Sequence, residues 1–312
     1  MPSQLPDSSA DSSGRSHLRV RHDTTYSYPV TASLAYNLAW LAPLNNDSQE
    51  LLQHQITVNP KPQIERMQTD SFGNSVRYFE VHSPHSQLQV SSEATVTRRP
   101  RPRNRHCQLP WESLRFDALA DTRLQVQFCA FAYPSPMVSF ADEIRDYTLV
   151  SFTKQRPMAE ALLSFANRIY ADYDYDPFAT KVETTLQEFC QLRKGVCQDF
   201  SHFAVSGLRS IGLVAAYVSG YVMTYPPEGQ EKRPGSDASH AWVAVWVPDY
   251  GWLHVDPTNK MWVEDEHLIV ALGRDYSDVP PLKGVCYGAG QQQPEVAVTM
   301  KTISSEELSH GH

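Results

Sequence analysis

Gly195-Val-Cys-Gln-Asp-Phe-Ser201 is the stretch from which the fold of this chain can be worked out. A helix is predicted to begin at Cys197, directly after the glycine, and to run to about Ile211. Strands are predicted next at residues 215–223, 241–247 and 252–255. Upstream, residues 158–170 have an apolar helical face, and Thr185-Leu-Gln-Glu188 is a capping box that opens a short helix ending near Lys194. These elements predict a mixed α and β region.

Cys197 occupies a position with chemical consequences. Backbone amides without a helical partner and the positive end of the helix dipole act on a group at a helix N-terminus. Such a position favours a thiolate, and the same amides can bind an oxyanion. A free cysteine is more often a small buried apolar residue, so Cys197 needs partners before it indicates catalysis.

Two partners are available further along the chain. Ser239-His-Ala-Trp-Val-Ala-Val-Trp-Val alternates as a strand should, and a turn at Pro248-Asp-Tyr-Gly251 returns the chain antiparallel through Trp252-Leu-His-Val-Asp256. Folding this hairpin brings His240 and Asp256 nearly opposite each other, where cross-strand neighbours are about 5 Å apart. A carboxylate at that distance can hold an imidazole in one tautomer.

Other interpretations of these residues remain open. His240 and Asp256 alone could be a surface pair at a hairpin end, and with Cys197 they could ligate zinc, although their spacing does not support this. His202 lies five residues after Cys197, roughly 500° around a helix, so we interpret it as a helix-face histidine and not as the base. The combination of cysteine, histidine and aspartate favours nucleophilic catalysis.

The N-terminal part of the chain has a different pattern. Short period-two runs from Leu18 to about Thr97 predict an all-β domain, with a turn at Asp70-Ser-Phe-Gly-Asn-Ser. Residues 1–16 are polar and are expected to be disordered. The segment Arg98-Arg-Pro-Arg-Pro-Arg-Asn-Arg-His106 could bind a polyanion, but it lacks aromatic residues for base stacking. We favour a stiff, solvated linker.

Composition limits the function classes further. The 312 residues carry a net charge of −8, which gives no basic field for nucleic acid or an acidic membrane. The N-terminus lacks a signal-peptide pattern, and the longest apolar run is too short to cross a bilayer. Five scattered cysteines without CxxC spacing argue against a disulfide framework or structural zinc. A cytoplasmic location is expected.

At these residues the chain resembles the transglutaminase-like superfamily, and closely its bacterial members regarded as cysteine proteases. The segments that carry the resemblance are Arg193-Lys-Gly-Val-Cys-Gln-Asp-Phe-Ser-His, Ala216-Tyr-Val-Ser-Gly-Tyr, Asp237-Ala-Ser-His-Ala-Trp-Val, Val255-Asp-Pro-Thr-Asn and Asp265-Glu-His-Leu-Ile-Val-Ala-Leu-Gly-Arg-Asp. The β-rich region, with Asp70-Ser-Phe-Gly-Asn, resembles the N-terminal domain found with these cores. The resemblance covers nearly all of residues 17–300.

The resemblance implies an α+β fold with a papain-like catalytic core behind an all-β domain. The expected division is a tail at 1–16, a β-rich domain at 17–97, a linker at 98–106 and a core with C-terminal strands at 107–312, whose motifs lie within 185–260. Cys197 would be the nucleophile, His240 the base and acid, and Asp256 the orienting carboxylate. The implied activity is cleavage or exchange of a peptide or isopeptide bond through a thioester. The alternatives are glutamine transamidation by an amine and a binding module that retains the fold.

Several finer expectations complete the sequence analysis. Oxyanion donors could be the backbone N–H of Cys197 and the side chain of Gln191, and Trp242 could wall the substrate cleft. Asp199 is expected to cap the helix start. The polar loop 225–237 is either a lid or passive. No metal, cofactor, nucleic acid or membrane partner is expected, the partner being a peptide or protein amide. The sequence does not indicate an oligomeric state.

Overall fold

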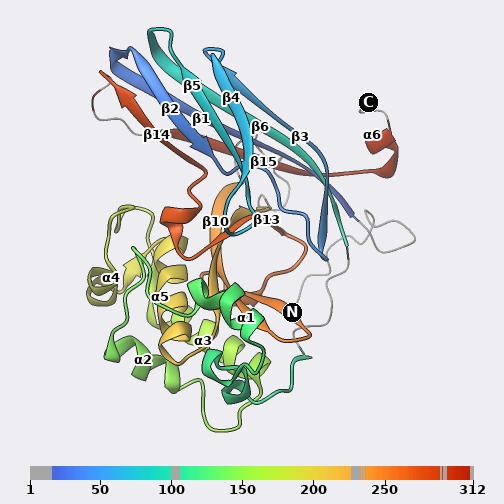
Figure 1. Cartoon of the computed structure of the whole chain (residues 1–312), viewed down its shortest axis with the longest axis vertical. Helices are drawn as coiled ribbons and strands as arrows, with labels where there is room; N and C mark the ends of the chain where they lie inside the picture. The colour runs from blue at the N-terminus through green and yellow to red at the C-terminus, as the bar shows by residue number, and fades with distance from the viewer. Residues whose placement is uncertain are drawn as a thin grey trace.

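The computed structural model describes residues 16–99, 106–225, 233, 235, 237–288, 290 and 294–309 of the chain. It consists of a β-sandwich and a mixed α/β core, which lie at the top and bottom of Figure 1. The predicted tail falls outside the described residues except for Ser16, which already begins the first strand. Most of the loop at 225–237 also falls outside them.

The sandwich is built from two four-stranded antiparallel sheets. One has the order β15-β1-β6-β3 and the other β14-β2-β5-β4. Tyr28, Phe79, Leu88 and Val90 are among the buried side chains between them, as the period-two pattern predicts. The strands are β1 (Ser16–Ala32), β2 (Leu34–Ala39), β3 (Gln49–Asn59), β4 (Ile64–Thr69), β5 (Ser75–Val81), β6 (His85–Arg98), β14 (Leu282–Tyr287) and β15 (Glu295–Ile303).

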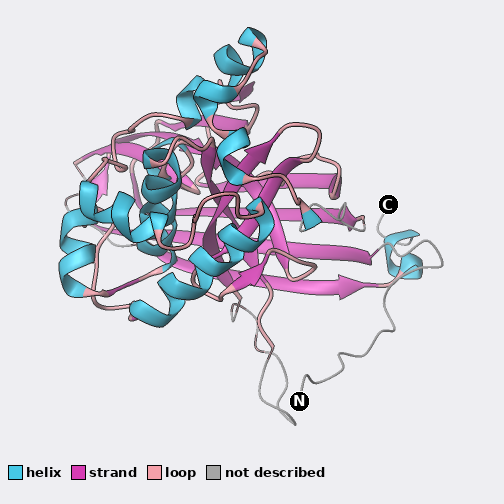
Figure 2. Ribbon diagram, turned by 90° about the horizontal axis from the view of Figure 1, so that it is seen from below, coloured by secondary structure: helices cyan, strands magenta, loops and turns pink. Residues whose placement is uncertain are grey.

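The core has a five-stranded antiparallel sheet of order β12-β11-β10-β9-β13, and helix α5 packs against its central strands β9 and β10. Figure 2 shows most of the helices on one side of the strands, and the helix next to the C-terminus apart from them. The strands of the core sheet are β9 (Ala215–Val222), β10 (Ala238–Val247), β11 (Gly251–Asp256), β12 (Met261–Trp262) and β13 (His267–Gly273). A separate parallel pair is formed by β7 (Asp174–Tyr175) and β8 (Lys194–Gly195).

The helices of the described residues follow the apolar periodicity of the sequence. On α3 the buried side chains include Leu162, Ala166 and Ile169, the face that the sequence predicts. The predicted capping box at Thr185 and Glu188 is present at the start of α4. The α-helices are α1 (Thr122–Phe128), α2 (Asp142–Leu149), α3 (Met158–Asp172), α4 (Leu186–Leu192), α5 (Cys197–Ser210) and α6 (Ser305–Ser309), with 3-10 turns η2 (Trp111–Leu114), η3 (Phe116–Ala118), η4 (Cys129–Phe131) and η5 (Tyr276–Asp278). No helix in the described ranges is long and apolar enough to cross a membrane.

Two boundaries drawn from the sequence are wrong in the structure. The C-terminal strands were assigned to the core, but β14 pairs with β2 and β15 pairs with β1, so both complete the sandwich. The solvated linker was expected to begin at Arg98, but this side chain is 1% exposed at the end of β6. Its guanidinium donates to the carbonyl oxygens of Glu264 and His267, which keeps the buried charge hydrogen-bonded. Residues 100–105 of the same segment lie outside the described residues.

Two buried amide side chains join the sandwich to the core at strand β13. The Gln49 amide donates to the carbonyl oxygens of Leu44 and Ile269 and accepts from the N–H of Ile269. The Asn74 amide bonds in the same way to both backbone groups of Leu272. Both residues are fully buried, so each amide replaces a missing strand neighbour at the edge of the core sheet.

Candidate functional site

Cys197 is the first residue of α5, as the sequence predicts, and its side chain is partly buried. The start of this helix is fixed by Asp199, whose carboxylate accepts from the N–H of Val196 at 2.9 Å and from the hydroxyl of Thr180 at 2.6 Å. The expected capping role of Asp199 is therefore confirmed. A side chain at Gly195 would bring its Cβ to 2.6 Å from the Asp199 carboxylate, so the glycine before Cys197 permits this close cap.

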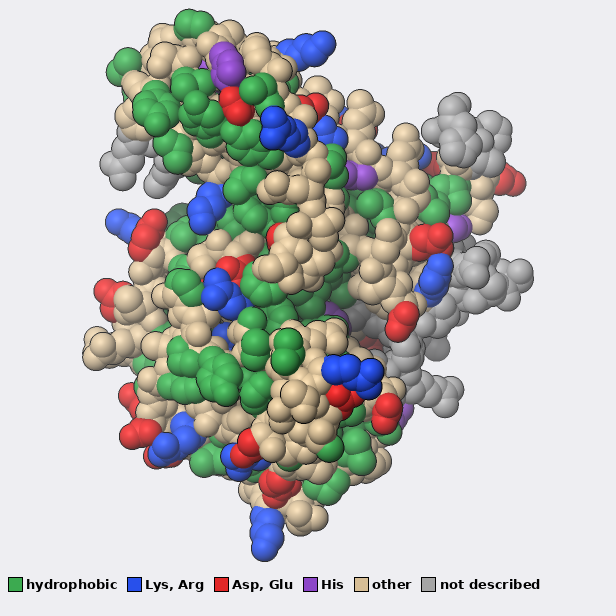
Figure 3. Space-filling model, viewed as in Figure 1, with side chains coloured by type: hydrophobic (Ala, Val, Ile, Leu, Met, Phe, Trp, Pro, Cys, Tyr) green, Lys and Arg blue, Asp and Glu red, His purple; other side chains and the backbone are tan. Residues whose placement is uncertain are grey.

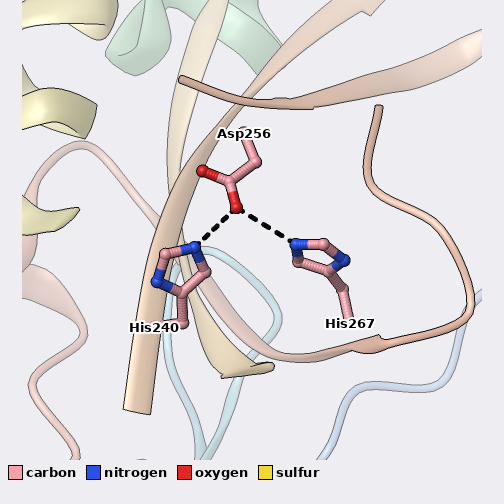
Figure 4. A group of neighbouring side chains, drawn as sticks. All are labelled: His240, Asp256 and His267. Carbon is pink, nitrogen blue, oxygen red and sulfur yellow. Dashed lines mark hydrogen bonds and ion pairs between the residues drawn. The ribbon is translucent and has the colours of Figure 1, made fainter. Parts of the chain in front are cut away.

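The hairpin of β10 and β11 brings His240 and Asp256 together. Val243 pairs with Val255, so Asp256 lies diagonally across from His240 and not directly opposite. The Nε2 of His240 lies 2.6 Å from the Oδ2 of Asp256, and both side chains are buried (Figure 4). His240 also interacts with the side chain of Cys197, and because Asp256 occupies Nε2, we assign this interaction to the other ring nitrogen, Nδ1.

Asp256 accepts more hydrogen bonds than the sequence predicts. Its Oδ2 also receives the Asn259 side chain at 2.7 Å and the Nε2 of His267 at 3.2 Å, as Figure 4 shows for the histidine. Its Oδ1 accepts from the backbone N–H groups of Thr258 and Asn259. The sequence analysis missed His267 and Asn259 as site residues. Both lie inside the segments that carry the family resemblance, which is the only signal that could have found them.

The charges at this site stabilise each other. Burial alone would lower the pKa of His240, but the Asp256 charge and hydrogen bonds to Asp256 and Cys197 raise it to about 10. Burial acts to raise the pKa of Asp256, but the nearby His240 and the hydrogen bonds from both histidines bring it well below its usual range. The arrangement therefore favours a protonated His240 between a carboxylate and the Cys197 sulfur, and an imidazolium there stabilises a thiolate.

The charge of a Cys197 thiolate acts on three tyrosine side chains, Tyr175, Tyr217 and Tyr276. Burial raises the pKa of Tyr217 well above its ordinary value, and the charge of a Cys197 thiolate raises it further. Burial and Cys197 also raise the pKa of Tyr175, and burial, Tyr26 and Cys197 raise the pKa of Tyr276. Their hydroxyls therefore remain protonated at neutral pH. The sequence analysis did not identify any of the three.

The other side chains that the sequence analysis singled out differ in their exposure. Gln191 is exposed on α4. Trp242 is fully buried, so its assignment to the cleft wall is wrong: its ring packs against His240 and His267, and its Nε1 donates to His254. His202 accepts from the N–H of Tyr276, and burial lowers its pKa to about 4, in line with its exclusion as the base.

His240, Asp256 and His267 also form a group of possible metal ligands, with ligand atoms within 4.8 Å of one another. The histidine nitrogens lie 2.6 and 3.2 Å from the same carboxylate oxygen, which is direct hydrogen-bonding distance. A zinc ion needs each ligand atom about 2.0–2.2 Å from itself, so it would have to separate these pairs. The described residues fit a hydrogen-bonded network, and the absence of a metal stays a prediction.

Comparisons with known proteins place this geometry in a family. The model of the bacterial transglutaminase-like N-terminal region matches residues 18–97, and that of the transglutaminase-like superfamily matches residues 147–257. An uncharacterized protein of Mycobacterium tuberculosis is 38% identical over 283 residues, covering 88% of this chain and 89% of that protein. The chain belongs to the transglutaminase-like superfamily. The second match contains Cys197, His240 and Asp256.

Further similarities support the fold and part of the core. An uncharacterized protein of Mycobacterium leprae is 30% identical over 290 residues, covering 92% of this chain and 99% of that protein. A solved structure of a candidate cysteine protease from Cytophaga hutchinsonii superimposes with a TM-score of 0.73 at 18% identity, covering 93% of this chain and 92% of the other. It shows the same α+β architecture. A protein-glutamine gamma-glutamyltransferase of Pseudomonas aeruginosa is 30% identical over 130 residues, 39% of this chain and 18% of that protein.

Proposed function

We propose that this protein is a thiol-dependent amide hydrolase that cleaves a peptide or isopeptide bond through a thioester on Cys197. The observation that carries the proposal is the buried hydrogen bond between His240 and Asp256, which holds the imidazole at the helix terminus that bears the thiol. A nucleophile, a base and an orienting carboxylate in this order are the parts that thiol catalysis needs.

The reaction follows from the positions of these groups. The Cys197 thiolate attacks the amide carbonyl, and the backbone N–H of Cys197 stabilises the oxyanion. His240 then donates its proton to the leaving amine, and a thioester remains on Cys197. Water enters, His240 takes one of its protons, and the hydroxide attacks the thioester. The carboxylic acid leaves and the thiolate returns to its pair with His240.

A second candidate function uses the same residues. The local similarity to a protein-glutamine gamma-glutamyltransferase favours resolution of the thioester by an amine instead of water. Product analysis with and without an added primary amine separates the two. An amide product that forms faster than the acid at millimolar amine supports transamidation, and acid alone supports hydrolysis.

The partner in either case is a peptide or protein amide, and we expect no nucleic acid or membrane partner. All five cysteines are free, which supports a reducing compartment such as the cytoplasm.

The experiment that tests the proposal is the pH dependence of iodoacetamide labelling, mapped to single cysteines by mass spectrometry. The exposed Cys129 is an internal control in the same molecule. We expect Cys197 to be labelled faster than Cys129 near neutral pH, and His240→Ala to slow this labelling. Cys197→Ala should abolish turnover while the circular dichroism spectrum is retained. Equal labelling of Cys197 in wild type and His240→Ala would contradict the triad and leave the binding module as the better interpretation.

A further inference from the structure

Residues 175–182 form an exposed apolar loop beside the start of α5. This 175–182 loop runs from the end of β7 towards α4. Three large apolar side chains on it face solvent, since Tyr175 is 58% exposed, Phe178 93% and Val182 47%. Single exposed apolar side chains are common on protein surfaces, but a cluster of large ones is typical of a binding surface.

The first part of the 175–182 loop is fixed to the residues before Cys197. In the parallel pair of β7 and β8, Tyr175 is in register with Gly195. The N–H of Asp176 donates to the carbonyl oxygen of Gly195 at 2.9 Å. Partial burial raises the pKa of Tyr175, and the charge of a Cys197 thiolate raises it further, so this tyrosine is within electrostatic reach of the nucleophile.

The last part of the loop is fixed to the residues after Cys197. The hydroxyl of Thr180 donates to the Oδ2 of Asp199 at 2.6 Å. The side-chain amide of Gln198 donates to the carbonyl oxygen of Val182 at 3.0 Å. Both anchors belong to the first turn of α5. The loop therefore runs beside the helix start that bears the thiol.

Phe178 lies between these anchors in a preformed turn. Its N–H donates to the Oδ1 of Asp176 at 2.9 Å, and the N–H of Ala179 donates to the carbonyl oxygen of Asp176 at 3.3 Å. Pro177 restricts the backbone between them, because its ring fixes φ. The backbone that carries the phenylalanine ring is thus ordered before any ligand arrives, which lowers the entropic cost of binding there.

The sandwich also approaches this region. Burial raises the pKa of Tyr276 on η5, and so do its interactions with Tyr26 of β1, Cys197 and Glu183. Tyr276 is therefore within electrostatic reach of the sandwich, the nucleophile and the residue that follows the 175–182 loop. The nucleophile thus lies on the side of the core that faces the sandwich, and Figure 3 shows a notch at one side of the molecule between these two parts.

Phe178 is close to Cys197 on the scale of a peptide substrate. Each lies two residues from one partner of the hydrogen bond between Asp176 and Gly195. Because a chain advances at most about 3.6 Å per residue, their Cα atoms are no more than about 20 Å apart, and an extended peptide of about six residues covers that distance. A substrate whose scissile carbonyl meets the thiol can therefore reach the loop with a nearby side chain.

We propose that the 175–182 loop selects the substrate by binding an apolar side chain, aromatic or long aliphatic, near the amide that Cys197 attacks. This inference rests on the proposed thiol chemistry and names its substrate class, a peptide with an apolar residue within about six positions of the scissile bond. Two rings in contact gain more than the area that they bury, so an aromatic side chain binds best. A polar side chain leaves Phe178 in water and gains nothing from the loop.

Alkylation of Cys197 by peptide reagents tests the proposal. Peptidyl chloromethyl ketones extend to the acyl side of the scissile bond, and iodoacetyl peptides extend to the amine side. Each set has a glycine and serine background of about six residues, with one phenylalanine placed at each position in turn. Site-mapped mass spectrometry gives kinact/KI, which is divided by the labelling rate with iodoacetamide alone for the same variant.

We expect phenylalanine at one position to raise this normalised kinact/KI about five-fold over serine, the gain of one contact between rings. Phe178→Ser should abolish the gain. Tyr287→Ser is the matched control and should keep it, because Tyr287 is an exposed aromatic residue on β14 of the sandwich. Phe178 is almost fully exposed, so its replacement should leave the fold intact, which circular dichroism checks.

Three results would overturn the inference. The first is a wild type in which phenylalanine exceeds serine at no position, and the second is a gain that survives Phe178→Ser. The third is a wild-type dimer in sedimentation velocity that Phe178→Ser dissociates, which would assign the loop to a second copy of the chain. The proposed hydrolase fails separately, if iodoacetamide alone does not label Cys197 faster than Cys129.

Discussion

Replacing Asp256 by asparagine tests the electrostatic centre of the proposed triad. Burial lowers the pKa of His240. The Asp256 charge and the hydrogen bonds to Asp256 and Cys197 outweigh burial and raise this pKa from 6.5 to about 10. That rise corresponds to a differential stabilisation of the imidazolium on the order of 5 kcal/mol. In Asp256→Asn the burial remains and the carboxylate charge is gone. We therefore expect the pKa of His240 to fall below its ordinary value.

The same change alters how stability depends on pH. The raised pKa of His240 means that its contribution is fully present below pH 6.5 and is lost as the pH rises towards 10. The lowered pKa of Asp256 means that its contribution is present above pH 3.8 and is lost as the pH falls below that value. The difference in the free energy of unfolding between wild type and Asp256→Asn should therefore be largest between about pH 4 and 6.5. Urea denaturation at pH 5 and pH 9 should show the difference shrinking at the higher pH.

Catalysis should suffer for a related reason. The new amide NH₂ would donate to the Nε2 of His240, which forces the ring proton onto Nδ1, the nitrogen that faces Cys197. A base with that tautomer cannot accept a proton from the thiol, and the corresponding change in a serine triad lowers kcat about 10⁴-fold. We expect a loss of about 10³ to 10⁴ in kcat/KM, measured on whichever amide substrate a screen identifies.

Histidine NMR titration decides whether this reasoning holds. Labelled wild type, Asp256→Asn and the control Asp265→Asn are compared, since Asp265 is an exposed carboxylate nearby. His240 should titrate near its wild-type value in the control only. An unchanged His240 titration in a folded Asp256→Asn protein would refute the role assigned to Asp256.

Three further predictions concern neighbouring residues. His267→Phe removes a hydrogen-bond donor to Asp256 and should lower kcat about ten-fold with KM unchanged. Steady-state kinetics measure both constants, and a change in KM alone would contradict this prediction. Gln49→Ala leaves buried backbone groups at Leu44 and Ile269 without partners and should lower the free energy of unfolding by about 2–4 kcal/mol in urea. Gln191→Ala should change kcat/KM less than about two-fold, because the side chain is exposed, and a loss of about 100-fold would instead restore it as an oxyanion donor.

Local patterns in the sequence predicted the elements that carry the site. The glycine before Cys197 and the apolar periodicity after it give α5, and the capping box gives the start of α4. Strand alternation gives β10 and β11, and the turn between them sets which residues pair. These features depend on neighbouring residues, so they can be found without tertiary structure.

The errors arose where distant segments meet. Arg98 looks like part of a basic linker, yet it is buried against the carbonyl oxygens of residues more than 160 positions away. Trp242 looks like a cleft residue, yet it is buried in a cluster with Val263 and Ile269, against which Leu44 packs from the loop between β2 and β3. β14 and β15 follow the core in sequence, yet they pair with strands from the beginning of the chain.

The sequence by itself determined the helix start at Cys197, the hairpin that brings His240 to Asp256, and the family. Each of these depends on short-range periodicity, on capping or on motifs within a few residues. Only the tertiary structure decided that His267 shares the Asp256 carboxylate, that Arg98 is buried against distant carbonyl oxygens, and that an aromatic-lined cavity lies between the sandwich and the core. Those contacts join side chains from separate segments, and their geometry depends on how sheets pack, which no local pattern encodes.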